Sequence, residues 1–282
     1  CMIIPAGPTE HRGGRGRGVV AGGRDASNPA IDTMDLIEIA TAGNATDFGN
    51  LSDGGRDYPA GCGSATRGIF FGGSEPGFRN IIDFVITSSS GGANDFGDML
   101  IAPLQNTALS NATRGITAGG LTAPTPAYTK NKSIEFITMA STYKRTIEYI
   151  TIATGGNTTN FGESSKAGAG GPAGASSVTR GVFAGGQHDN PYPLSDIIDY
   201  ITIATEGNAI DFGDLAAATV QASGLSNSIR GCFAGGSSPN KTNVISFVTI
   251  ASTGNATDFG DLTVARDRLN QGAADAHGGI GR

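Results

Sequence analysis

Hydrophobic residues in this chain occur in short alternating segments, which are separated by polar connections rich in glycine. The segment Met34 to Thr41 (MDLIEIAT) is an example. Its Leu36 and Glu38 fall on one face of an extended strand and Ile37 falls on the other, an alternation that is typical of β-strands. No segment repeats its apolar residues at the spacing of an amphipathic helix. The pattern therefore predicts an all-β protein with almost no helix.

Two sequence landmarks recur in step along the chain. One is TGNATDFGDL at Thr253 to Leu262, and the other is TRGVFAGG around Arg180, which precedes each copy of the first. The arginines are spaced by 50, 47, 66 and 50 residues and the phenylalanines by 48, 65, 51 and 47. A period of about 50 residues is typical of propellers and solenoids, so we expect five copies of one supersecondary unit. The phenylalanines are Phe48, Phe96, Phe161, Phe212 and Phe259.

Each unit contains four predicted strands: a loose one before the arginine, then the equivalents of RGVFAGG, IDYITIAT and DFGDL. Four short antiparallel strands form one propeller blade. We therefore expect one β-propeller domain over residues 1–282, with strands near Arg17 to Ala21 and Leu36 to Ala40 and at equivalent positions. A repetitive β-fibre or solenoid is the alternative. The expected repeats span about residues 5–52, 53–100, 101–164, 165–216 and 217–263, with a further leading strand within 264–282.

The glycine pair after the second strand, as in FFGGS at Phe70 to Ser74, resembles the kelch motif of galactose-oxidase-type propellers. The whole unit, RGVFAGG followed by IDYITIATEGNAIDFGDL, resembles kelch-like repeats in structural and tail-fibre proteins of tailed bacteriophages. The likeness runs from about Arg12 to the C-terminus. It departs from the kelch pattern because the chain has no Trp, and DFG supplies phenylalanine at the start of the fourth strand. The resemblance implies a kelch-like β-propeller and a place in a virion.

The third unit is longer than the others by about 16 residues. It holds two similar strands, Ile134 to Ser141 and Ile147 to Thr154, with Lys130, Lys132 and Lys144 in or beside them. We expect the first of these strands to lie outside the regular blade, or at its edge, and to contact another chain.

A leading strand is present at both ends of the chain, because AHGGIGR around His277 resembles EHRGGRGR around His11. Only one copy can complete a closing blade. We expect the other copy to pair with a neighbouring subunit or to continue into further sequence, since an unpaired strand exposes backbone hydrogen-bonding groups.

The landmark arginine opens the second strand and the aspartate of DFG opens the fourth, and in an up-and-down blade these strands begin at the same end. We therefore predict structural pairs between them, because a guanidinium can bind a carboxylate and backbone carbonyls together. A ring of arginines that binds anions is the functional alternative. The predicted pairs join Arg17, Arg67, Arg114, Arg180 and Arg230 to Asp47, Asp95, Asn160, Asp211 and Asp258.

The connection after each Gly-Gly varies from unit to unit, for example RDASNPA in the first and SSPNKTN in the last. In a propeller it emerges on the same face as the fourth-to-first connection. Variable loops on a constant scaffold carry recognition, so we take their charged and aromatic residues as candidates for ligand binding. They are Arg24, Asp25, Tyr58, Phe78, Tyr128, His188, Tyr192 and Lys241.

Two classes of function follow from this organisation. The first is a non-enzymatic binding module of a virion appendage, which attaches to a host-surface glycan or protein through one propeller face. The second is a structural module that packs against sister subunits in a tail, fibre or coat. Exposed aromatic residues on the variable face would favour the first, and a large apolar flank would favour the second. In both cases we expect a location on a virion or extracellular surface, in an oligomer or larger assembly.

Composition and motifs narrow the choice further. The net charge of −6 and pI near 5.0 give no general attraction to phosphate backbones, so we expect no nucleic acid partner. No apolar run is long enough for a membrane helix, and three cysteines cannot form a disulfide framework. The sequence contains no GxSxG, CxxC, HExxH or P-loop motif, and no two of its three histidines have metal-ligand spacing. We therefore expect no enzymatic activity, cofactor or metal.

Overall fold

The computed structural model describes residues 16–27, 29–64, 66–100, 102, 107–110, 115–118, 121–122, 129–130, 146–149, 159–165, 171–187, 193–269 and 272–274. Within these ranges the only helices or strands are β-strands. The predicted all-β class is confirmed. In the same ranges there is accordingly no helix long and apolar enough to cross a membrane.

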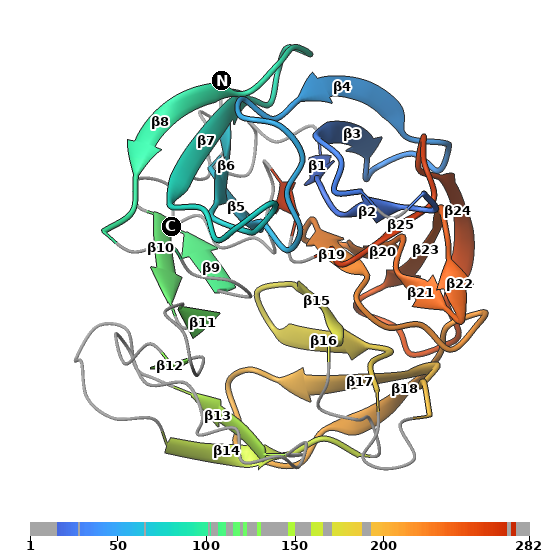
Figure 1. Cartoon of the computed structure of the whole chain (residues 1–282). Coiled ribbons are helices and arrows are strands. Elements are labelled where there is room, and N and C mark those ends of the chain that lie inside the picture. The colour runs from blue at the N-terminus through green and yellow to red at the C-terminus, as the bar shows by residue number, and fades with distance from the viewer. Residues whose placement is uncertain are drawn as a thin grey trace, which may run out of the picture.

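Four antiparallel sheets of four strands each lie side by side around a common centre, in a propeller-like arrangement (Figure 1). Each sheet is named after its second strand. They are the β1 sheet, with β26 (Ala273–Ala274), β1 (Arg17–Ala21), β3 (Thr33–Glu38) and β4 (Thr46–Asn50); the β6 sheet, with β5 (Ala60–Gly63), β6 (Arg67–Phe71), β7 (Ile81–Ile86) and β8 (Asn94–Asp98); the β16 sheet, with β15 (Ala173–Ser176), β16 (Arg180–Ala184), β17 (Ile197–Thr202) and β18 (Ile210–Asp214); and the β20 sheet, with β19 (Ser223–Ser226), β20 (Arg230–Ala234), β23 (Val244–Thr249) and β24 (Thr257–Asp261).

In the third unit the described strands form three separate two-stranded pairs. Its strand β9 lies against β5 of the β6 sheet, as expected for the next first strand around the centre. The duplicated segment Ile134 to Ser141 lies outside the described residues, so its predicted contact with another chain stays a prediction. The pairs are β9 (Thr107–Ser110) with β10 (Gly115–Ala118), β11 (Leu121–Thr122) with β12 (Thr129–Lys130), and β13 (Thr146–Tyr149) with β14 (Thr159–Glu163).

The hydrophobic core lies between neighbouring sheets. Val19 and Val20 are adjacent in β1, yet Val19 packs in a cluster shared with Phe70 of the β6 sheet, whereas Val20 packs in a cluster shared with Phe259 of the β20 sheet. Successive residues of a strand point to opposite faces, and here both faces meet a neighbouring sheet. The alternation of side chains therefore supplies two cores, and strands such as β3 are buried on both sides.

The first strands β26, β5, β15 and β19 surround the centre and consist largely of glycine, alanine and serine. Their backbones lie very close together: a Cβ added at Gly224 of β19 would be 2.0 Å from the carbonyl oxygen of Gly174 in β15. Larger side chains would force these strands apart. The small residues of the loosely patterned strand before each arginine therefore allow the sheets to converge.

The C-terminal leading strand completes the β1 sheet. Ala273 and Ala274 pair with Val19 and Gly18, so the end of the described chain joins its beginning in one sheet. The earlier copy, around His11, lies outside the described residues. Its predicted pairing with a neighbour or with further sequence stays a prediction.

The nearly constant GNATDFG turn joins each sheet to the one before it. In the β20 sheet, the N–H groups of Gly254 and Ala256 donate to the carbonyls of Phe212 and Asp214 on β18, at 2.7 and 2.8 Å. The side chain of Asn255 also accepts a hydrogen bond from the N–H of Asp214, at 3.1 Å. The equivalent turns beginning at Gly43, Gly91 and Gly207 make the same pair of backbone contacts on β24, β4 and β14. These turns cover the outer edges of four strands, which explains the constancy of this landmark.

Candidate functional site

The landmark arginines join neighbouring sheets, but through carbonyl oxygens. The guanidinium of Arg180 lies 4.5 Å from the ring centre of Tyr200 in its own sheet and donates to the carbonyl of Ile250 in the next sheet, at 2.9 Å. Arg230 lies over Phe247 and donates to the carbonyl of Ala40 at 3.0 Å in the same manner. The cation–π contact places each guanidinium over an aromatic ring of its own sheet.

For the four pairs whose side chains the structure describes, the predicted pairing of these arginines with the DFG aspartates is wrong. Arg17 forms its ion pair with Glu38 at 2.7 Å and donates to the carbonyl of Thr87 at 3.0 Å, while Arg67 lies over Phe84. The aspartates close local turns instead, since their carboxylates accept the N–H of the glycine two residues on. This is seen for Asp47, Asp95 and Asp211. Asp258 forms no described ion pair with an arginine, and the side chains of Arg114 and Asn160 lie outside the described residues.

Two buried ion pairs, which the sequence analysis missed, each tie a fourth-to-first connection to the third strand of the sheet that it enters. Arg56 pairs with Asp83, and Arg266 pairs with Asp35 at 2.8 Å, with all four side chains fully buried. Burial lowers the pKa of each arginine, while the charge of its aspartate acts in the opposite direction. The available signal was an aspartate at the third residue of three of the third strands, at Asp35, Asp83 and Asp199, together with the dipeptide Arg-Asp in two fourth-to-first connections.

A connection leads from the fourth strand of each sheet to the first strand of the next. In three of these fourth-to-first connections, a large residue at the same position has a left-handed backbone conformation. These residues are Tyr58, Gln221 and Arg268, with φ values of 54°, 60° and 53°. In a fourth connection the equivalent residue is Gly171, with φ 65°. Residues other than glycine rarely adopt this conformation because it strains the backbone, and such residues cluster at functional sites. The chain therefore keeps this strain at three of the four equivalent positions that the structure describes.

Backbone hydrogen bonds link these connections to one another, and we call the linked connections the belt. The N–H of Gln221 donates to the carbonyl of Gly171, that of Leu269 donates to Gln221, and that of Tyr58 donates to Arg268, at 3.1, 3.2 and 3.0 Å. Since each connection leads into a central first strand, the belt brings residues from distant parts of the chain together. Its position is fixed by the main chain.

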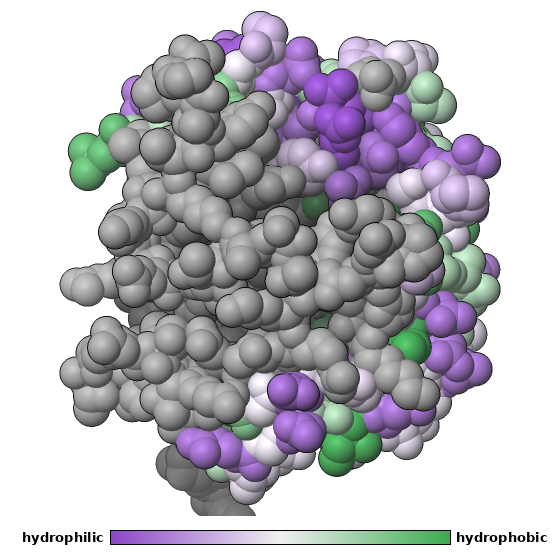
Figure 2. All heavy atoms as spheres, turned by 60° about the horizontal axis from the view of Figure 1, so that its bottom comes forward, coloured by the Kyte–Doolittle hydropathy of each residue, from purple (hydrophilic) through white to green (hydrophobic). Residues whose placement is uncertain are grey.

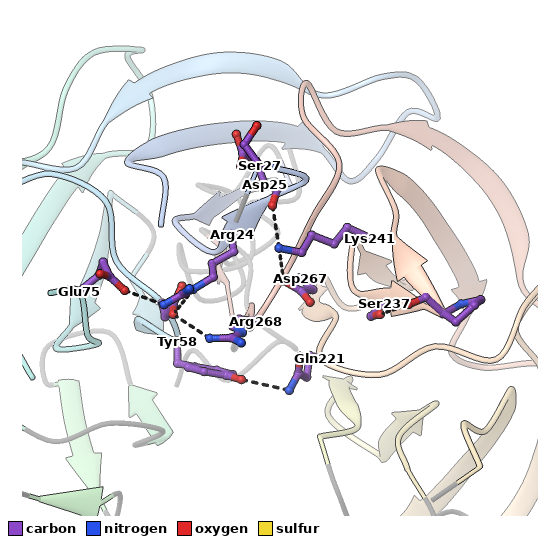
Figure 3. A network of polar contacts seen from close by, with 12 residues as sticks. Arg24, Asp25, Ser27, Tyr58, Glu75, Gln221, Ser237, Lys241, Asp267 and Arg268 are labelled. Atoms are coloured by element: carbon purple, nitrogen blue, oxygen red, sulfur yellow. Dashed lines mark hydrogen bonds and ion pairs between the residues drawn. The ribbon is translucent and has the colours of Figure 1, made fainter. Parts of the chain in front are cut away.

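The belt and two neighbouring loops form a polar network, which we name the axial cluster: Arg24, Asp57, Tyr58, Glu75, Gln221 and Arg268 (Figure 3). The side chain of Arg24 bridges Asp57 and Glu75, at 2.6 Å to each. Arg268 donates to the same Asp57 oxygen at 3.3 Å, and the Gln221 amide donates to the Tyr58 hydroxyl at 3.0 Å. The hydrogen bond to Asp57 raises the pKa of Arg24 against the lowering effect of its burial.

The structure gathers five of the eight predicted ligand-binding residues at this face: Arg24, Asp25, Tyr58, Phe78 and Lys241. Arg24 and Tyr58 belong to the axial cluster, while Lys241 lies beside it, donates to the backbone carbonyl of Asp25 at 2.6 Å and forms an ion pair with Asp267 at 3.4 Å (Figure 3). Phe78 lies in the loop that also supplies Glu75, where it bridges to Ser74. The remaining candidates lie outside the described residues. They are Tyr128, His188 and Tyr192.

Four residues of the axial cluster were not among those predicted from the variable loops: Asp57, Glu75, Gln221 and Arg268. Within the described part of the chain, no group of three or more His, Cys, Asp or Glu side chains could hold a metal ion. The face offers hydrogen-bond donors and acceptors next to backbone segments that are themselves hydrogen-bonded to one another.

No family model matches this chain, and no curated protein matches it. Among solved structures, the chain is similar to one titled "Structure of YjhT", with 12% sequence identity and a TM-score of 0.41. The match covers 85% of this chain and 80% of that one.

Proposed function

We propose that this chain is a non-enzymatic binding module that recognises a surface ligand through the axial cluster. The supporting architecture in this proposal is a kelch-like propeller of five units, one of which is the longer third unit. The resemblance of the repeats to bacteriophage proteins supports a place in a virion appendage, and the ligand is then a glycan or protein of the host surface.

One observation carries the proposal: three separate connections place strained, large polar residues at one point. If the connections served only to join strands, glycine would relieve the strain at each position, as it does at Gly171. Instead Tyr58, Gln221 and Arg268 keep left-handed backbones and direct polar groups to one network. Strain that is retained at a convergent surface is typical of ligand sites.

The surface favours this function over simple packing in a coat or tail. The exposed large hydrophobic residues of the described chain are spread over three sheets, and in the coloured part of Figure 2 hydrophobic residues are isolated spots among hydrophilic ones. A permanent packing interface requires a continuous apolar area. The exposed residues are Ile86, Phe96, Leu100, Val178, Ile203, Ile210, Ile229 and Val244.

The proposal is tested by screening the full chain against arrayed glycans and against extracted host-surface proteins. Each ligand found is then measured with wild type and with the double variant Tyr58→Ala, Gln221→Ala. The control is Arg67→Gln, at the opposite end of the β6 strand from the loops. We expect the double variant to lose binding while the control keeps it. Equal binding by all three proteins would place the ligand elsewhere and overturn the proposal.

A further inference from the structure

The groups of the axial cluster that reach solvent have opposite charges. The side chain of Arg268 is 37% exposed, and its one hydrogen bond among the described residues goes from Nη1 to Asp57. The side chain of Glu75 is 41% exposed and holds Arg24 through Oε2. A ligand at this face therefore meets a cationic donor and an anionic acceptor together.

The formal charges of the axial cluster cancel. Arg24 and Arg268 contribute two positive charges, and Asp57 and Glu75 contribute two negative charges. An anionic ligand would be attracted by Arg268 but repelled by Glu75, and a cationic ligand would meet the reverse. A hydroxyl group both donates and accepts hydrogen bonds, so a ligand rich in hydroxyls can satisfy both side chains without net charge.

The network also contains an unsatisfied polar atom. Asp57 is buried, and its Oδ1 accepts no hydrogen bond from the described residues although Oδ2 accepts two. Buried acceptors without partners are uncommon in stable cores and occur where structure is kept for a functional reason. Of the five buried polar atoms without a hydrogen-bond partner among the described residues, this is the one that belongs to the axial cluster.

We propose that the axial cluster binds an uncharged saccharide. Arg268 donates to one hydroxyl of the sugar, and Glu75 accepts from another. This inference rests on the proposed function and narrows its ligand to neutral glycans. Glu75 disfavours acidic glycans, because its negative charge repels theirs.

The test measures the full chain on arrayed neutral and acidic saccharides, and then measures affinity for the best one with Glu75→Gln, Arg268→Gln and the control Arg67→Gln. For a neutral ligand, Glu75→Gln and Arg268→Gln should each weaken binding by about tenfold, since each loses a hydrogen bond to a charged group. Raising the salt from about 0.05 M to about 0.5 M should change the affinity less than about twofold, because no net charge is neutralised.

Other results would overturn the inference and separate it from the proposed function. Selective binding of acidic saccharides, with tighter binding by Glu75→Gln and a steep loss in salt, would contradict the neutral ligand while keeping the axial cluster as the site. If the chain bound only a protein ligand and Arg268→Gln lost that binding, the saccharide would be ruled out while the axial cluster remained the site. Saccharide binding that none of the cluster variants changes would remove both this inference and the proposed function.

Discussion

Arg266 and Asp35 are 231 residues apart in sequence and form a fully buried ion pair. The guanidinium also donates to the carbonyl of Thr33 at 3.0 Å, and the hydroxyl of Thr263 donates to the other Asp35 oxygen at 2.5 Å. The pair thus ties the connection after β24 to the third strand of the β1 sheet, at the point where the chain closes on itself. It is one of two such pairs among the described residues.

Removing one partner of this pair should destabilise the protein severely. Arg266→Thr leaves the charge of Asp35 buried without its counter-ion, which costs about 3 to 5 kcal/mol of unfolding free energy. The measurement is urea unfolding followed by far-UV circular dichroism. A loss below about 1 kcal/mol would show that the pair is not a main contact between the chain ends.

The chain supplies its own control for that experiment. In the β20 sheet, Ser246 stands at the position of Asp35, and Thr219 stands at the position of Arg266 in the connection that leads into that sheet. The double variant Asp35→Ser, Arg266→Thr reproduces this uncharged arrangement. We expect it to be more stable than Arg266→Thr alone, because no charge is left unpaired. If the double variant lost as much stability as the sum of the losses in Asp35→Ser and Arg266→Thr, the two residues would not be coupled.

The landmark arginine should contribute less than the buried pair. Arg180→Ala removes a cation–π contact with Tyr200 and a hydrogen bond to Ile250, so we expect a loss of about 1 to 2 kcal/mol and a lower melting temperature. Arg180→Lys keeps the charge but not the planar fork, and its melting temperature should lie between the other two. An unchanged melting temperature in Arg180→Ala would rule out the role between sheets.

Cys232 should make stability depend on alkaline pH. Burial raises the pKa of its thiol to about 12. The unfolded thiol ionises near its ordinary pKa of about 8.5, so above that pH the unfolded state holds fewer protons and folding becomes less favourable until the folded pKa is reached. Below the unfolded pKa this contribution is fully present.

The measurement compares wild type with Cys232→Val, which copies Val182 at the equivalent position of β16. We expect the stability of wild type to fall faster between about pH 9 and about pH 11 than that of Cys232→Val. The thiol of Cys232 should also resist alkylation in the folded protein at about pH 8. Parallel pH profiles of stability for the two proteins would show that the pKa of this thiol does not differ between the folded and unfolded states.

Strand positions and the relation between loops could be read from the sequence because they repeat. The second strand predicted at Arg17 to Ala21 has the bounds of β1, and the loops after Gly-Gly do meet the fourth-to-first connections, as β2 (Arg24–Asp25) and β25 (Arg266–Asp267) pair directly. The third strand β3 (Thr33–Glu38) ends before the predicted Ala40, because Thr41 already turns back to the carbonyl of Glu38. Local periodicity determines strands well and their last residues poorly.

The partners of individual side chains could not be read in the same way. The landmark arginine recurs in all five units and the DFG aspartate in four, but they recur for separate reasons. The arginine contacts the next sheet, whereas the aspartate closes its own turn. The axial cluster was found only in part because Gln221 and Arg268 share no residue type with Tyr58. They share a backbone conformation, and φ is not visible in side-chain chemistry.

The central claim is that the axial cluster is kept for binding at a cost to stability, and Arg268→Gly tests it most directly. Glycine adopts a φ of 53° without strain, as Gly171 does at the equivalent position, so the variant should fold and be as stable as wild type or more stable by up to about 1 kcal/mol. Melting temperature and ligand affinity are measured on the same preparation. We predict an equal or higher melting temperature together with loss of binding. A clearly lower melting temperature with unchanged binding would show that Arg268 serves the fold and would contradict the account.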